Sequence, residues 1–235
     1  VKISLLQREG VILNLRREIY LCLPEEGEGT YSRELVANHL LHSSYVSYET
    51  VLSRAGVIPE RVALLKSSCM KRSKVFDNAT GRYGTIQAPE AYFPIGLTRQ
   101  KTEEGYFYLT ATPEKALCDL IVSSSNLHIQ SMKTMRSYLN EYLRADWDMI
   151  TGMDISIIRA CAEKTNKKKN ELNFLERTMS CLSSKIRTRL NLVDRVLPAI
   201  SGHGEVVLGK YSTSFDQQNP SCIRLIYSIF GNLLM

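Results

Sequence analysis

The spacing of apolar positions changes several times along the chain, and each change marks a predicted element. Residues 1–9 carry apolar side chains at helical spacing and are followed by Gly10, which predicts the end of a helix. Two short apolar runs at 11–15 and 19–23 predict a pair of strands. Residues 24–29 are polar and contain glycine, so the pattern predicts a loop that closes this first segment.

The next stretch changes from helical spacing to alternation. Apolar positions predict a helix over 30–41, and Ser47 is a suitable N-cap for a second helix that ends at Gly56. From residue 61 to 111, β-branched and aromatic runs separated by turn signals predict a small antiparallel sheet. The strands expected in it are 62–66, 74–76, 82–87, 92–97 and 106–110.

Helical patterns return after the sheet. Thr112 followed by Pro113 and an acid is a typical helix start, and further helices are expected at 131–143, 154–163 and 168–185. The pattern as a whole predicts an α+β fold: a partial winged helix-turn-helix, then a small antiparallel sheet packed with helices, then a helical C-terminal region. The expected domains are 1–29, 30–185 and an extension of uncertain role at 186–235.

The net charge of the chain permits an anionic partner, and the distribution of charge along the chain indicates where such a partner would bind. The 235 residues include 30 Lys and Arg against 24 Asp and Glu, a formal charge of +6. The window from Arg159 to Arg195 holds ten basic and four acidic residues and so matches the whole excess. The distribution of charge alone therefore favours the C-terminal half of the chain as the region that would bind an anionic partner.

Three groups of side chains are candidates for contact with an anionic partner. The first is the opening helix and hairpin, whose helix would enter a DNA groove while the basic hairpin lies along the phosphates. Its alternative is an ordinary helix–hairpin with two solvated arginines. The candidate DNA contacts are Gln7, Arg8, Asn14, Arg16 and Arg17.

The second and third groups are basic stretches farther along the chain. Either could attract a nucleic acid or an acidic protein, but lysines also protect edge strands and coat solvated helices, so both alternatives stay open. The residues concerned are Lys66, Lys71, Arg72 and Lys74 in the sheet region, and Lys167, Lys168 and Lys169 in the helical region.

Cysteine usage and the absence of recognisable catalytic patterns argue against other classes. Six scattered cysteines without a C-x-x-C pair predict no structural zinc, no cofactor and a reducing, cytoplasmic location. Neither a signal segment nor a membrane-spanning stretch is evident. Ser68 and Lys71 fit S-x-x-K, and Asp146 and Asp148 could be paired carboxylates, but both lack their partner motifs. We therefore expect no enzyme.

Four segments together resemble one family. They are Gly10-Val-Ile-Leu-Asn-Leu-Arg-Arg-Glu-Ile-Tyr20, Ser44-Tyr-Val-Ser-Tyr-Glu-Thr-Val-Leu52, Gly56-Val-Ile-Pro-Glu60 and Ala111-Thr-Pro-Glu-Lys-Ala-Leu-Cys-Asp-Leu120. Their order and spacing resemble the antitoxins of AbiE abortive-infection systems, the type IV toxin–antitoxin modules of bacteria. The resemblance covers roughly Leu5 to Val122.

The resemblance implies a winged-helix domain that binds operator DNA and represses its own operon, followed by an α/β antitoxin domain. The antitoxin would counteract a nucleotidyltransferase-like toxin without forming a tight complex with it. A winged helix would need about two more helices before Val1. The alternative function is a non-enzymatic interaction protein that binds an acidic protein or RNA through its basic helical surface.

Overall fold

The computed structural model describes residues 2–23, 31–182, 184, 206–208 and 211–213. Contacts divide the chain into two units, 1–183 and 184–235. In the second unit, described residues 206–208 (β9, Val206–Leu208) and 211–213 (β10, Tyr211–Thr213) form an antiparallel strand pair. The predicted extension at 186–235 otherwise lies outside the described residues.

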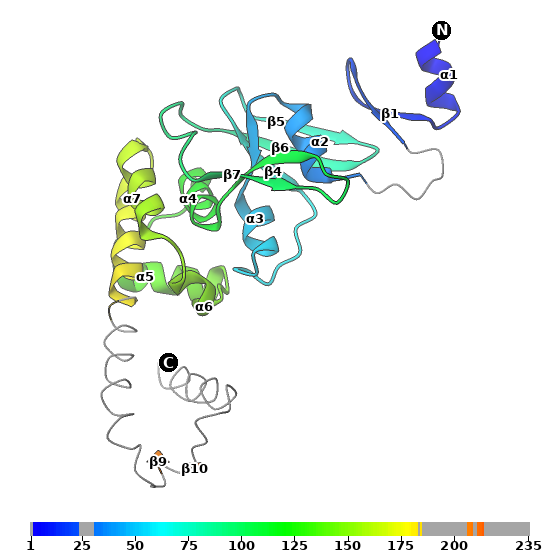
Figure 1. Ribbon diagram of the computed structural model, residues 1–235. Coiled ribbons are helices and arrows are strands. Elements are labelled where there is room, and N and C mark those ends of the chain that lie inside the picture. Colours follow the sequence, from blue (N-terminus) through cyan, green and yellow to red (C-terminus); the bar gives the residue numbers. More distant parts are fainter. Residues whose placement is uncertain (1, 24–30, 183, 185–205, 209–210, 214–235) are drawn as a thin grey trace. The chain divides into compact units, whose positions relative to one another are not determined.

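The centre of the first unit is a six-stranded sheet with the order β5-β6-β4-β3-β8-β7 (Figure 1). Its strands are Ser44–Val46 (β3), Leu65–Cys69 (β4), Lys74–Asn78 (β5), Gly81–Gln87 (β6), Leu97–Lys101 (β7) and Phe107–Ala111 (β8).

The sheet is mixed, so the prediction of an antiparallel sheet was wrong. Strand β3 runs parallel to β8, and β4 runs parallel to β6, while the other three neighbouring pairs are antiparallel. Alternation of apolar and polar residues fixes which face a side chain takes, but it specifies neither the partner nor the direction of a strand.

Two strand predictions also failed locally. Strand β3 was missed because it has only three residues, all buried, and therefore shows no alternation. The strand expected at 92–97 is a series of turns, and β7 begins only at Leu97. The predicted strands at 74–76, 82–87 and 106–110 are confirmed with small shifts of their ends.

Three helices flank the sheet, and two of them begin at a residue whose side chain caps the helix. Ser47 precedes the third but makes no capping hydrogen bond, because its hydroxyl donates to Asp119 instead. Helix α2 (Arg33–Leu40) contacts β3, β4 and β8, whereas α3 (Tyr48–Arg54) contacts β4 and helix α4 (Pro113–Ser123). Thr112 accepts a hydrogen bond from the Lys115 amide and precedes Pro113, as the sequence predicts for the start of α4.

The remaining helices of this unit lie between residues 132 and 182 (green to yellow in Figure 1). They are α5 (Met132–Ser137), the π-helical η1 (Tyr138–Tyr142), α6 (Trp147–Thr151), α7 (Ile155–Lys164) and a helix at 169–182. Helix α7 packs against α4. The predictions at 131–143 and 154–163 are confirmed, and α6 was not predicted.

The chain opens with the predicted helix and hairpin. Helix α1 (Lys2–Arg8) leads through Gly10, at a φ of +73°, into the antiparallel strands Ile12–Arg16 (β1) and Ile19–Cys22 (β2). The positive φ costs glycine little because it has no Cβ. The helix and the hairpin are thus confirmed, while the winged helix-turn-helix stays a prediction.

Candidate functional site

The predicted DNA contacts lie mostly on the outside of the helix–hairpin. Gln7 and Arg8 are exposed at the end of α1, and Asn14 is exposed on β1. Arg16 is only half-buried, and its Nε has no hydrogen-bond partner among the described residues. Arg17 occupies the turn of the hairpin.

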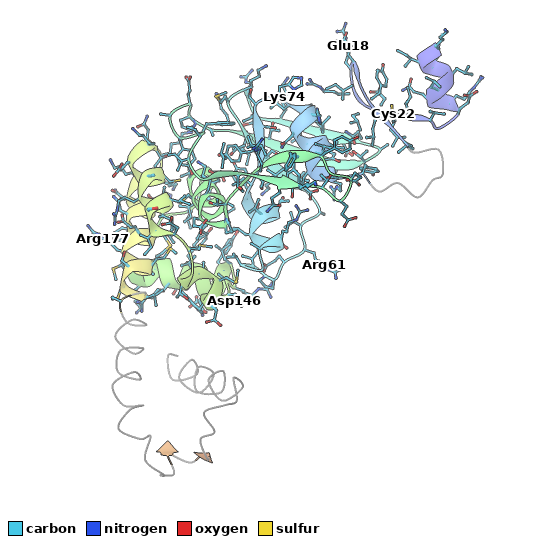
Figure 2. All side chains as sticks on the ribbon, viewed as in Figure 1. Glu18, Cys22, Arg61, Lys74, Asp146 and Arg177 are labelled. Carbon is cyan, nitrogen blue, oxygen red and sulfur yellow. The ribbon has the colours of Figure 1, made fainter. Side chains whose placement is uncertain are left out.

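The side chain of Arg17 is free to contact a polyanion. It is 94% exposed, and its ion pair with Glu18, at 3.7 Å, is also fully solvated. Such exposed pairs contribute almost nothing to stability, so a phosphate group can replace the carboxylate. Figure 2 shows Glu18 at the tip of the hairpin.

The basic residues expected to share a face of the sheet separate into two environments. Lys66 is part-buried on the interior strand β4, and its Nζ lies 2.7 Å from a carboxylate oxygen of Glu49. Lys71 and Arg72 are exposed in the connection from β4 to β5. Lys74 is exposed at the start of β5, where Figure 2 labels it. Of these four residues, Lys71, Arg72 and Lys74 are the exposed ones.

The three consecutive lysines do not form a helix face. Lys167 and Lys168 lie in the bend before the helix at 169–182, and Lys168 has a φ of +55°. The Lys168 ammonium is paired with Glu171 at 3.4 Å and donates to the Leu127 carbonyl. Lys167 and Lys169 are exposed, so two of the three lysines are available to a partner.

A buried ion pair on α4 was not predicted from the sequence. Lys115 and Asp119 are one helical turn apart with side chains 0% and 1% exposed, and their Nζ and Oδ1 atoms are 3.3 Å apart. Lys115 also donates to the Tyr92 carbonyl at 2.9 Å, and its Nζ lies 3.0 Å from the centre of the Tyr92 ring. Ser47 donates to the other oxygen of Asp119 at 2.6 Å.

The signal for this pair was present in the sequence but had a simpler interpretation. Opposite charges at i and i+4 usually form a solvated surface pair. Here both charges lie within a run that is otherwise apolar, Ala-Leu-Cys between them and Leu-Ile after them. Charged residues in such a run are rarely buried unless they are paired.

Burial shifts the pKa values of Asp119 and of the tyrosines near it. Desolvation raises the pKa of Asp119, although the Lys115 ammonium and the Ser47 hydrogen bond oppose that shift. Desolvation also raises the pKa values of Tyr45, Tyr48 and Tyr92, and the nearby charge of Asp119 adds to each increase. The tyrosines therefore remain protonated at neutral pH.

The sequence motifs weighed for catalysis have structural roles here. Ser68 is buried with its hydroxyl 2.6 Å from that of Tyr48, whereas Lys71 is exposed. Asp146 is the N-cap of α6 and accepts from the amides of Asp148 and Met149. Within the described part of the chain, no three His, Cys, Asp or Glu residues are grouped to hold a metal ion.

No described helix is both long enough and apolar enough to cross a membrane. None of the models of known protein families matches the chain, and none of the curated proteins matches it either.

Proposed function

We propose that this protein is the antitoxin of a type IV toxin–antitoxin module of bacteria and a DNA-binding repressor of its own operon. The observation that carries the DNA-binding part is the exposed helix–hairpin with Arg17 at its turn. The four sequence segments that resemble AbiE antitoxins support the antitoxin part. The module would act in the cytoplasm and abort phage infection.

In this proposal the hairpin positions the protein on its operator through phosphate contacts. Arg17 and Arg16 neutralise phosphates along one strand, while Gln7 and Arg8 at the end of α1 lie near the bases. Asn14 adds a neutral hydrogen bond from β1. Because α1 contributes no buried residue, Gln7 and Arg8 can change without altering the core.

A mobility-shift titration with the DNA upstream of the coding sequence tests the interface. Arg17→Ala is expected to lower affinity and to reduce the slope of log affinity against log salt by about 1, since one phosphate contact is lost. Arg61→Ala is the matched control, because Arg61 is an exposed arginine far along the chain from the hairpin (Figure 2). Equal losses for both variants would remove the hairpin from the interface.

The antitoxin part is tested by co-expression with an adjoining nucleotidyltransferase-like gene. The protein should restore growth, while a pull-down recovers no stable complex of the two proteins. Growth inhibition that persists despite normal expression would contradict the antitoxin assignment.

The exposure of Lys167 and Lys169 favours a second candidate, an interaction protein that binds an acidic protein or RNA. Under this alternative, Lys167→Glu combined with Lys169→Glu abolishes toxin neutralisation and leaves operator binding unchanged. Neutralisation that survives both substitutions contradicts it.

A further inference from the structure

Strand β1 of the hairpin contains a bulge directly before its two arginines. The register of the strand pair shifts between Asn14 and Arg16, where three residues of β1 lie opposite two residues of β2. Leu15 is therefore the extra residue of the bulge. A bulge bends its strand and changes the direction of the side chains that follow it. The directions of Arg16 and of Arg17 thus depend on how Leu15 is held.

The side chain of Leu15 is anchored in the core that surrounds the six-stranded sheet. Leu15 is 6% exposed and belongs to the same cluster of buried apolar residues as Tyr83 on β6. Regular alternation would place Ile12 and Leu15 on opposite faces of β1, yet both are buried. The bulge accounts for this pattern, because its extra residue returns Leu15 to the buried face.

The main chain of Leu15 is held by a side chain of the sheet, at a point where β1 lies against β5. Asn78, the last residue of β5, donates from its Nδ2 to the Leu15 carbonyl oxygen at 3.1 Å. The Oδ1 atom of Asn78 accepts from the amide and from the hydroxyl of Thr80, at 3.0 and 2.7 Å.

The hydrogen bonds of Asn78 continue into the core. The Thr80 hydroxyl lies 2.7 Å from the hydroxyl of Tyr83, and Tyr83 is 1% exposed. Both polar atoms of the Asn78 side chain are therefore engaged, one with the hairpin and one with a turn that is fixed to a buried tyrosine. A continuous chain of hydrogen bonds connects the main chain of the hairpin to the interior of the sheet region.

The arginine at the turn depends on this support. Arg17 is 94% exposed and its ion pair with Glu18 is solvated, so the side chain contributes almost nothing to its own placement. The turn takes its direction from β1, and β1 is joined to β5 at Leu15. A binding group gains affinity when its supporting main chain is already fixed before the ligand arrives.

We propose that Asn78 is a positioning residue for the hairpin: by holding the Leu15 carbonyl at the bulge, it fixes the direction in which Arg16 and Arg17 meet the DNA phosphates. This inference rests on the proposed function and adds to it a residue that lies outside the hairpin. Loss of the Asn78 side chain frees the hairpin but removes no group that contacts DNA.

Operator affinity and its salt dependence in Asn78→Ala test the proposal, with the DNA upstream of the coding sequence as the probe. Affinity should fall by about threefold to tenfold, because one well-formed hydrogen bond to the hairpin is lost. The slope of log affinity against log salt should stay within about 0.3 of the wild-type value, because every arginine is retained. Arg17→Ala differs, since it should reduce that slope by about 1.

Hydrogen exchange without DNA gives a second measurement of the same contact. In Asn78→Ala the amides of residues 12–22 should exchange faster than in the wild-type protein, because the hairpin is no longer held against β5. The amides of β8 should exchange at the wild-type rate. Circular dichroism defines a temperature at which each variant is folded, and all comparisons are made there.

Asn38→Ala is the matched control. The Asn38 amide also holds a main chain: it donates to the Leu109 carbonyl at 3.2 Å and accepts from the Leu109 amide at 2.6 Å. These residues lie on α2 and β8, away from the hairpin strands. Asn38→Ala should therefore lower the unfolding midpoint and leave operator affinity within about twofold of the wild-type value.

Three results would overturn the positioning role of Asn78. They are equal losses of affinity in Asn78→Ala and Asn38→Ala, a salt slope that falls by about 1 in Asn78→Ala, and hairpin amides that exchange at the wild-type rate in that variant. A wild-type protein that does not bind the operator would instead contradict the proposed function. Hydrogen exchange would still decide whether Asn78 holds the hairpin, so the two failures are distinguishable.

Discussion

The helix–hairpin at the start of the chain and the surroundings of α4 use the same kinds of side chain in opposite ways. Arg17 is 94% exposed and has only a solvated partner, whereas Lys115 is 0% exposed and makes three short contacts. A solvated cation can exchange partners with a ligand at little cost, but a buried one is fixed by its surroundings. Under the proposed function, binding and stability therefore depend on different parts of this protein.

The same contrast holds for apolar residues. In α1, Ile3, Leu5 and Leu6 are all more than a third exposed, whereas every residue of α4 from Lys115 to Ile121 is buried. Substitutions in α4 should thus change the free energy of unfolding, and substitutions in α1 should barely do so.

The largest effect is expected from breaking the buried ion pair. Lys115→Met leaves the Asp119 carboxylate without its cation in a fully buried position, which should lower the free energy of unfolding by about 3–5 kcal/mol. Urea unfolding followed by circular dichroism measures the loss.

The double variant Lys115→Met with Asp119→Leu is the matched test of that pair. It removes both charges and fills their volume, so it should be less destabilised than the sum of the two single variants. If the losses in free energy of unfolding of the two single variants add up in the double variant, the two charges act independently. The buried pair would then contribute no more to stability than a solvated surface pair does.

Alkaline pH should destabilise the buried region next most strongly. Burial raises the pKa values of Tyr45, Tyr48 and Tyr92, while the same residues ionise near pH 10 in the unfolded chain. Stability is therefore fully present below about pH 10 and is lost above it, by about 1.4 kcal/mol per pH unit for each tyrosine. Urea unfolding between pH 8 and pH 11 measures this slope.

Tyr45→Phe sharpens the pH test. The Tyr45 hydroxyl has no hydrogen-bond partner among the described residues, so its removal should not destabilise the protein at neutral pH. The alkaline slope should fall by about 1.4 kcal/mol per pH unit, because one buried phenol is lost. An unchanged slope would mean that Tyr45 does not contribute to the alkaline transition.

The difference between the regions also explains what could be predicted from the sequence. Local signals were sufficient where an element depends on its own residues: Gly10 ended α1, and Thr112 with Pro113 began α4. They were insufficient for strand direction, because β3 and β8 are paired across more than sixty residues and nothing in Ser44–Val46 specifies that partner.

The candidate sites also differ in whether local sequence signals are sufficient to predict them. Exposed cations such as Arg17 are visible in a sequence because their role depends on charge at the surface. The Lys115–Asp119 pair depends on Ser47 and Tyr92, which come from two other segments of the chain. Sequence spacing cannot show that folding brings these segments together.

Two glycines with positive φ values give a smaller effect that separates packing from backbone strain. A Cβ on Gly96, at a φ of +60°, would lie 2.9 Å from Lys115 Cβ and 2.9 Å from Ile157 Cγ2. Gly96→Ala should therefore cost about 2–3 kcal/mol through strain and overpacking combined. A Cβ on Gly10, at +73°, would meet nothing within 4 Å, so Gly10→Ala should cost only about 1 kcal/mol. Thermal unfolding compares them, and equal losses would contradict the tight packing around Lys115.

The smallest effect is expected at α1. Leu5 is 41% exposed, so Leu5→Ser should change the free energy of unfolding by less than about 0.5 kcal/mol. Leu52→Ala is the buried counterpart and should cost about 2–5 kcal/mol, since Leu52 is 0% exposed in the core. Both values come from urea unfolding at one protein concentration and again at a tenfold higher one. A loss above 1 kcal/mol for Leu5→Ser that grows with concentration would mean that α1 packs against a second molecule in solution, and the exposed region would then contribute to stability as the buried one does.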